Sequence, residues 1–284
     1  MMAAAHRPRK RPAEGNGTVQ EVDTLQGSRE RQRAMAQFVV AQGNVLVTDL
    51  ASRFGVTTMT IRRDLDELES IGILRRTHGR ATAISSSLFE ASSEYRIDEN
   101  RREKLAVAKA VTKFVKPGQA VFLDDSTTSI FIAQEIKALA PLTVITNFDA
   151  IAQLVKKEPG ITLNVIGGQY QPWCDAYQGG QSIDSIKRMR ADVFIMSAAA
   201  IVDNSCFHQA LETGLIKSAM FESSSTRILC VDHTKFQRRA LHMMAPLTAF
   251  DVVIVDSGTP SDVLHDLNQH GVNVLVAEEP VQAP

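Results

Sequence analysis

The 284-residue sequence has no long apolar segment and few cysteines. No apolar run approaches the ~18 to 20 residues of a membrane-spanning helix, and the N-terminus lacks the apolar stretch of a secretory signal peptide. The three cysteines, Cys174, Cys206 and Cys230, are odd in number and widely spaced, which argues against a disulfide framework and against a zinc site. We therefore expect a cytoplasmic chain with reduced thiols, no metal and no membrane partner.

The net charge is also close to zero, at −1, but the positive and negative residues are unevenly distributed along the chain. Residues 1–83 contain 13 Lys and Arg against 9 Asp and Glu, whereas the remaining residues contain 18 against 23. Only the first part of the molecule is therefore suited to meet a polyanion. The length suits two domains, and the hydrophobic content of 44% is sufficient for packed cores.

Residues 45–80 predict a helix-turn-helix followed by a short basic hairpin. Gly55 can adopt the positive φ that ends a helix, and Thr57 can cap the next one. Two apolar stripes at helical spacing define the helices: Val47, Leu50 and Phe54 in the first, and Ile61, Leu65 and Leu68 in the second. The stripes should pack on each other, which is the arrangement of a helix-turn-helix.

Polar and basic side chains surround this predicted helix pair. The N-terminal end of the second helix is the part that enters a major groove, so we expect base contacts from Thr57, Thr58, Met59 and Arg62. Arg63 has two interpretations, since it could contact DNA or pair with Glu67 on a solvated helix. The hairpin would act as a wing that presents four groups to phosphates or to the minor groove: Arg75, Arg76, His78 and Arg80.

The flanking segments complete the domain plan. Residues 1–28 are basic and poor in apolar residues, which predicts a disordered arm. A helix from about Ser28 should face the core with Met35, Phe38 and Val39 and face solvent with Arg29, Arg31 and Arg33. We assign residues 29–84 to an all-α winged helix-turn-helix domain, the serine-rich residues 85–98 to a linker, and residues 99–284 to a second domain.

The second domain alternates short apolar strands with amphipathic helices. Strands are predicted at 120–123, 142–145, 161–166, 193–196, 228–231, 252–255 and 272–276, and helices at 99–115, 128–139, 148–157, 182–190, 209–222 and 261–270. This order is typical of an α/β domain whose open, mostly parallel sheet is covered on both faces. Ligands of such sheets bind at the carboxyl ends of the strands.

Polar residues and glycines follow four of these strands. The first strand leads into Asp124, Asp125, Ser126, Thr127 and Thr128, whose hydroxyls at a helix N-terminus suit a phosphate but are also ordinary helix caps. Further along the chain, three more strands end in Thr146 and Asn147, in Gly167 and Gly168, and in Asp232 and Lys235. We expect these residues to share one ligand site.

Both halves of the chain resemble the DeoR family of bacterial transcriptional regulators. The run FGVTTMTIRRDLDELESIGILRRTHGR resembles the family's DNA-binding signature, with Thr57 where Ser is usual and Arg80 where a second wing glycine is usual. The second half resembles the family's effector domain through Asp124, Ser126, Thr127, Thr128, Thr146, Asn147, Gly167, Gly168, Glu212, Lys217, Asp232 and Lys235. It departs by carrying Ser126 for Gly, His233-Thr234 in the last motif and a five-residue spacing from Glu212 to Lys217.

The resemblance implies a ribose-5-phosphate-isomerase-like effector domain that senses phosphorylated sugars. It therefore implies a repressor of a sugar or polyol catabolic operon, with a phosphorylated sugar or polyol as effector and no other cofactor. Such a protein would bind double-stranded operator DNA as a homo-oligomer, a dimer or tetramer, and would be nucleoid-associated in the bacterial cytoplasm when bound.

Two alternatives remain open at this point. One is a sugar-phosphate isomerase-like enzyme with a carboxylate base and Lys235 steadying an enediolate, against which Arg62 and Arg63 argue because an isomerase has no use for them. The other concerns two side chains near the predicted site. Trp173 could stack on a sugar or lie in a core or interface, and His208 could bond hydroxyls or be structural.

Overall fold

The computed structural model describes residues 27–28, 31–32, 34–36, 38–39, 42–70, 74–83 and 93–278. The chain divides into two compact units, Met1–Ile84 and Ser85–Pro284. The predicted basic arm lies outside the described residues except for Gly27 and Ser28, which are helical.

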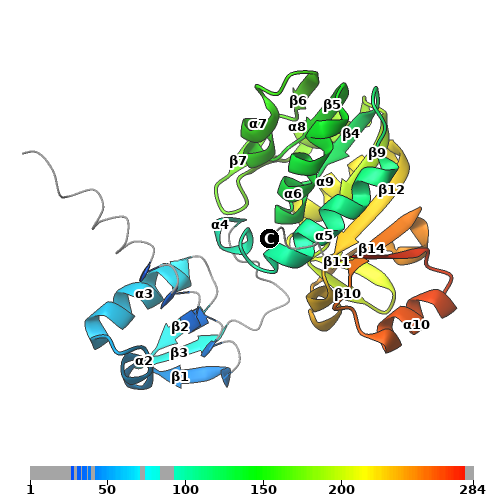
Figure 1. The fold of residues 1–284 in the computed structure, drawn as a ribbon. Coiled ribbons are helices and arrows are strands. Elements are labelled where there is room, and N and C mark those ends of the chain that lie inside the picture. Colours follow the sequence, from blue (N-terminus) through cyan, green and yellow to red (C-terminus); the bar gives the residue numbers. More distant parts are fainter. Residues whose placement is uncertain are drawn as a thin grey trace, which may run out of the picture. The chain divides into compact units, whose positions relative to one another are not determined.

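The first unit is a winged helix-turn-helix, as predicted (Figure 1). The described residues between 27 and 42 are all helical. After them come β1 (Asn44–Leu46), α2 (Val47–Phe54), α3 (Thr58–Ser70), β2 (Leu74–Thr77) and β3 (Arg80–Ala83). The predicted stripes meet in one core, where Met35, Leu50, Ile61 and Leu65 are fully buried. The unit is not all-α, because the three strands form an antiparallel sheet in the order β1-β3-β2. At three residues, β1 is too short to carry a strand pattern in the sequence.

The turns of this unit have the predicted chemistry. Gly55 ends α2 with a φ of 64°, and the Thr57 hydroxyl accepts a hydrogen bond from the Thr60 amide at 3.2 Å, capping α3. In the wing, His78 and Gly79 have φ values of 49° and 78°, as a two-residue type I′ turn requires. Arg80 then begins β3, so the turn does not need a glycine there.

A seven-stranded parallel sheet forms the centre of the second unit, as predicted (Figure 1). Its strands are shorter or longer than the predicted ranges by a few residues at most, and every neighbouring pair is parallel. The strand order is β15 (Val274–Ala277), β14 (Val252–Asp256), β12 (Ser224–Val231), β9 (Ala191–Met196), β4 (Ala120–Leu123), β5 (Leu142–Thr146) and β6 (Ile161–Val165).

Helices cover both faces of this sheet, because its strands are apolar on both sides. Val121 and Leu123 of β4 pack in one core with α5 (Arg101–Val111), α6 (Thr127–Ile136) and α7 (Asp149–Val155). Phe122 points to the other core, which includes α8 (Gly180–Lys187), α9 (Leu211–Glu222) and α10 (Ser261–Gln269). The carboxyl edge between the two layers is left for the site.

Several short elements were not predicted, because segments of three to five residues give little periodic signal. They are a hairpin of β7 (Gln169–Gln171) and β8 (Ala176–Gln178), and an antiparallel sheet of β10 (Ala200–Val202), β11 (Ser205–His208) and β13 (His242–Pro246). The predicted linker is also shorter than expected, since α4 (Ser93–Arg96) lies within the second unit. Among the described residues, no helix has the length and apolar character of a membrane span.

Candidate functional site

The four residues predicted to read bases lie together at the start of α3, and Arg63, for which two interpretations were open, lies beside them. Thr57, Thr58, Met59, Arg62 and Arg63 are all exposed, and 71% of the Met59 surface is accessible. An exposed helix N-terminus in a helix-turn-helix is the end that enters a major groove. The structure thus places these five residues where base contact is possible, and the contact itself stays a prediction.

The wing residues have two different environments. Arg75, His78 and Arg80 are exposed, and Arg80 donates a hydrogen bond to Asn44 on the neighbouring strand. Arg76 instead forms ion pairs with Asp66 and Glu69 of α3, and its backbone amide also donates to Glu69 at 2.9 Å. Arg76 therefore fastens the wing to α3.

Asp64 is a structural residue that the sequence did not single out. It lies in the apolar stripe of α3 and is only 2% exposed. The Arg31 guanidinium donates to it at 2.7 Å and 3.1 Å, so Arg31 does not face solvent freely as expected. A buried carboxylate requires such a partner, and this pair joins the first helix to α3.

The second predicted site is a pocket at the carboxyl ends of β4, β9 and β12, which we call the strand-end pocket. Its hollow measures about 370 Å³, including space open to solvent. It is lined by Arg96, Asp125, Ser126, Thr127, Thr128, Trp173, Cys174, Ser197, Ala198, Ala199, His208, Lys217 and Lys235.

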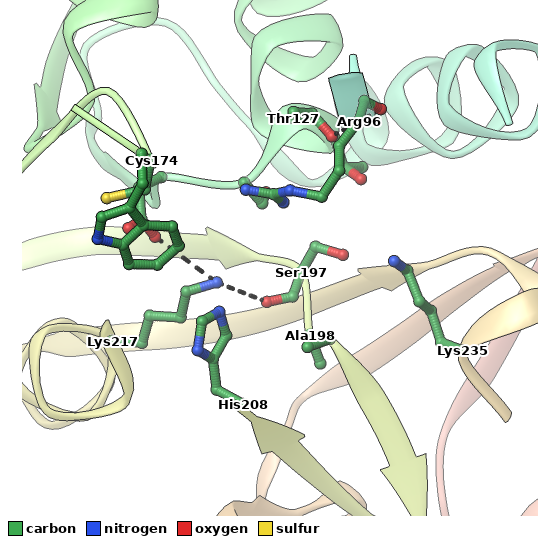
Figure 2. A pocket seen from close by; sticks show the side chains of 13 residues that line it. Arg96, Thr127, Cys174, Ser197, Ala198, His208, Lys217 and Lys235 are labelled. Carbon is green, nitrogen blue, oxygen red and sulfur yellow. Dashed lines mark hydrogen bonds and ion pairs between the residues drawn. The ribbon is translucent and has the colours of Figure 1, made fainter. Parts of the chain in front are cut away.

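Three cationic side chains from separate elements meet at this pocket (Figure 2). Arg96 extends over the hollow from α4, while Lys217 of α9 and Lys235 of the 3₁₀ helix His233–Gln237 point toward it from the opposite side. His208, at the end of β11, points in the same direction as Lys217. The pocket is therefore suited to an anion.

A buried ion pair forms the floor of the strand-end pocket. Lys217 Nζ lies 2.7 Å from Asp124 Oδ2 and donates to the Ser197 carbonyl at 3.0 Å, and Asp124 is completely buried. Asp124 also accepts hydrogen bonds from Ser126 Oγ at 2.6 Å and from the Ser197 amide at 2.9 Å. Burial alone would raise the pKa of Asp124, but the Lys217 charge and these hydrogen bonds hold it below its usual range. Asp124 therefore organises the pocket without lining it.

The predicted phosphate loop forms the first turn of α6. The Ser126 hydroxyl accepts from the Ser129 amide at 3.2 Å, so it is a helix cap, and Thr127 and Thr128 begin the helix. The first amides of a helix have no partner within it, and the positive end of the helix dipole lies there. Capping and anion binding are therefore both compatible with these residues, because all three line the pocket.

Asp232 and Lys235 occupy the far side of the pocket. Asp232 is 3% exposed and its Oδ2 lies 3.9 Å from Lys235 Nζ. Its Oδ1 accepts from Asn100 Nδ2 at 3.0 Å and from the Thr234 amide at 3.1 Å. Burial alone would raise the pKa of Asp232, but Lys235 and the Thr234 hydrogen bonds lower it. Lys235 therefore lines the pocket, and Asp232 caps the 3₁₀ helix that carries Lys235.

Besides Asp124 and Asp232, five more predicted effector residues do not line the strand-end pocket. Asn147 donates to the Tyr177 carbonyl at 3.0 Å, and the Thr146 hydroxyl accepts from the Phe148 amide at 3.1 Å, so both shape the backbone near β8. Glu212 is exposed on α9 and is not among the residues that line the strand-end pocket, so its place in the effector site stays a prediction. Gly167 and Gly168 line a separate, open groove next to α8.

Gly168 has a packing reason for its missing side chain. Its φ is 153°, and a Cβ there would lie 2.1 Å from Ser182 Oγ and 2.6 Å from the Gln178 carbonyl oxygen. The glycine therefore permits close approach of the chain to α8 and β8, whereas a ligand contact was expected.

Several pocket residues were missed or left open by the sequence. Arg96 lies in a segment read as a linker, and Ser197 to Ala199 follow a predicted strand end without a recognisable motif. Trp173 and His208, for which two interpretations were open, both line the pocket, and Cys174 joins them from the β7–β8 turn. The strand-end position was the usable signal for Ser197, whereas nothing in the sequence indicated Arg96.

Comparisons with known proteins cover both units. The family model for a DeoR-like helix-turn-helix domain matches residues 31–87, and the model for the DeoR C terminal sensor domain matches residues 99–257. A putative aga operon transcriptional repressor of Escherichia coli O157:H7 is 31% identical over 256 residues, covering 89% of this chain and 95% of that protein. The glycerol-3-phosphate regulon repressor of Escherichia coli K12 is 28% identical over 246 residues, covering 86% and 97%.

A solved structure gives a weaker match. Ribose 5-phosphate isomerase A from Methanocaldococcus jannaschii is 16% identical, with a TM-score of 0.36, and the match covers 49% of this chain and 55% of the enzyme. The two family models and the relatives that span the chain describe transcriptional regulators, not enzymes, which removes the isomerase alternative. The chain belongs to the DeoR family and is a DNA-binding transcriptional regulator.

Proposed function

We propose that a small phosphorylated sugar or polyol binds in the strand-end pocket and controls the affinity of this regulator for operator DNA. The chain would repress a sugar or polyol catabolic operon, and the ligand would release it. One observation carries the proposal: Arg96 and Lys235 converge with the first turn of α6 on one hollow. Helix amides together with side-chain cations are a recurring arrangement for phosphate.

The phosphate end of the ligand fits between α6 and the two cations at the pocket's mouth. The Thr127 and Thr128 amides at the helix start can donate to phosphate oxygens. Arg96 can add a forked, bidentate contact and Lys235 a point charge. Lys217 is paired with Asp124 at 2.7 Å and lies 3.7 Å from Asp125, so these carboxylates compensate its charge and we assign it no direct contact.

The remaining wall suits the carbon chain and hydroxyls of a sugar or polyol. Trp173, at 36% exposure, offers an indole surface, and His208 and Ser197 offer hydrogen-bonding groups.

Tight, specific operator binding requires more than one copy of the chain. One winged unit buries too little surface for tight, specific binding, so we propose a homo-oligomer, a dimer or tetramer, joined through the sensor domain. The relative named as a glycerol-3-phosphate regulon repressor supports the choice of a phosphorylated compound as effector. We place the protein in the bacterial cytoplasm, on the nucleoid when bound.

Replacing Lys235 by alanine is expected to weaken effector binding by roughly 10-fold to 100-fold. A hydrogen bond to a charged group is worth about 1.5–3 kcal/mol, and each 1.4 kcal/mol is about tenfold. The concentration of phosphorylated compound that half-releases the operator should rise by that factor in a fluorescence anisotropy titration. Lys187→Ala is the matched control, because Lys187 is an exposed lysine of α8 outside the pocket. An unchanged midpoint for Lys235→Ala would remove Lys235 from the site.

A further inference from the structure

The short helix α4 is tied to the strand-end pocket by both of its ends. At its first residue the Ser93 amide donates to the Trp173 carbonyl at 3.3 Å. At its last residue the Arg96 side chain lines the pocket, and its backbone carbonyl accepts from Lys104 Nζ and from the Thr127 hydroxyl. The position of α4 therefore depends on residues of the pocket wall.

Asn100 makes a second connection four residues later. Its side-chain amide donates to Asp232 Oδ1 at 3.0 Å and to Thr234 Oγ1 at 3.2 Å. Asp232 and Thr234 belong to the segment that carries Lys235, so Asn100 joins the α4 region to the other cation at the mouth of the pocket. With a φ of 50°, Asn100 occupies the left-handed region that Asn tolerates better than most residues.

Lys104 is a buried lysine that the proposed phosphate contacts do not use. It is 4% exposed on α5, and its Nζ reaches the Arg96 carbonyl. The charged groups around it come from several elements: Arg96 of α4, Glu99 of the following turn, Asp232 at the end of β12, and Lys235 of the 3₁₀ helix. Its ammonium thus lies where a change of charge in the pocket acts on it directly.

The contacts of α4 bear on regulation because α4 follows the DNA-binding unit in the chain. The DNA-binding unit ends at Ile84, and α4 begins at Ser93, so α4 is the first described element of the sensor unit after the connecting residues. We propose that Asn100 and Lys104 are positioning residues that hold α4, and with it Arg96, in the pocket, so that an anion in the pocket changes how firmly α4 is held. This inference rests on the proposed anion site and adds how occupancy reaches the chain leading to the DNA-binding unit.

The charge state of Lys104 predicts in which direction anion affinity changes with pH. Burial, and secondarily the Lys235 charge, lower the pKa of Lys104 to about 7. An anion bound near Arg96 and Lys235 favours the charged ammonium, so binding raises this pKa and takes up a proton. Anion affinity should therefore fall as pH rises above about 7, by at most about tenfold per pH unit.

Hydrogen exchange of the ligand-free full chain tests the positioning role. Lys104→Met keeps the side-chain length but cannot donate, and Asn100→Gly removes the donor from a backbone conformation that glycine adopts readily. Both variants should speed exchange of the amides in residues 93–100 by roughly fivefold, the equivalent of one lost hydrogen bond. Lys109→Met, an exposed position on the same helix, should leave it unchanged. Unchanged exchange in both test variants would overturn the proposal.

Sulfate binding between pH 7 and 9 tests the link to the pocket, because sulfate keeps its charge over this range. Trp173 is the single tryptophan of the chain and lines the pocket, so its fluorescence reports occupancy at constant ionic strength. Affinity should fall with pH in the parent protein and in Lys109→Met, and stay nearly flat in Lys104→Met. An equal pH dependence in Lys104→Met would contradict the role of Lys104. If the parent protein binds no sulfate at any pH, the anion site of the proposed function fails, while the exchange measurement still decides whether Asn100 and Lys104 hold α4.

Discussion

Lys217→Met is expected to lower the unfolding free energy of the sensor unit by about 3–5 kcal/mol, because it leaves Asp124 as an unpaired buried charge. Asp124 is completely buried and Lys217 is its ion-pair partner at 2.7 Å. Methionine fills much of the lysine volume, so the loss comes from electrostatics more than from a cavity. Urea unfolding of the full chain at pH 7 measures it, with Lys187→Met as the exposed control.

The pH dependence of this loss identifies its cause. In the parent protein the pKa of Asp124 lies below the ordinary value of 3.8, so its contribution is present above that value and is lost as pH falls through the folded pKa. Without Lys217, burial is no longer opposed by the lysine charge and the pKa rises. The difference in stability between the parent and Lys217→Met should therefore shrink as pH is lowered from 7. A constant difference, or one below about 1 kcal/mol at pH 7, would show that the pair does not hold the pocket floor.

Arg62→Ala is expected to cost about 1–3 kcal/mol of discrimination between the operator and single-base variants of it, or roughly 5-fold to 150-fold in affinity ratio. Arg62 is exposed on the first turns of α3, and among the described contacts its guanidinium makes no ion pair. It is thus available for a bidentate contact with a guanine. Competition anisotropy at one fixed salt concentration measures the ratio.

Arg75→Ala separates base reading from phosphate contact in the same assay. Arg75 is exposed on the wing strand β2, where a phosphate contact would weaken binding to all sequences about equally and leave the affinity ratios unchanged. If Arg62→Ala also weakens all sequences equally, Arg62 contacts only the backbone of the DNA. Arg76 is unsuitable for this comparison, because its ion pairs with Asp66 and Glu69 hold the wing on α3.

The sequence predicted the elements with long, regular patterns. The two helical stripes of residues 47–68 and the apolar strands around Phe122 and Phe194 carry their periodicity locally, so local reasoning located them. The same reasoning failed for β1, β7 and β10, which are only three residues long. β1 pairs with β3, beyond both helices of the pair, whereas β7 and β10 form hairpins with the neighbouring strands β8 and β11. Strand pairing determines the conformation of such short segments, and it leaves no periodic pattern in the sequence.

The sequence identified pocket residues mainly where they follow the end of a predicted strand. Ser126, Thr127, Thr128 and Lys235 follow β4 and β12 and do line the pocket. Glu212 does not line it, because five residues separate Glu212 from Lys217 on α9, which at about 100° per residue places Glu212 on a different, exposed face of the helix. Arg96 could not be found, since a four-residue helix placed by contacts with Lys104 and Thr127 has no signature of its own.

We propose that occupancy of the strand-end pocket by a phosphorylated compound controls operator binding. The most direct test is the fluorescence anisotropy of a labelled fragment from the gene's own upstream region, at one fixed salt concentration, with a panel of phosphorylated sugars and polyols. Each compound is paired with its unphosphorylated counterpart, so that the phosphate requirement is measured separately from the sugar. We expect specific binding of the fragment and its release by one phosphorylated compound at concentrations where the unphosphorylated partner has no effect. Specific binding that no phosphorylated compound changes, or release by the unphosphorylated partner at equal concentration, would contradict it.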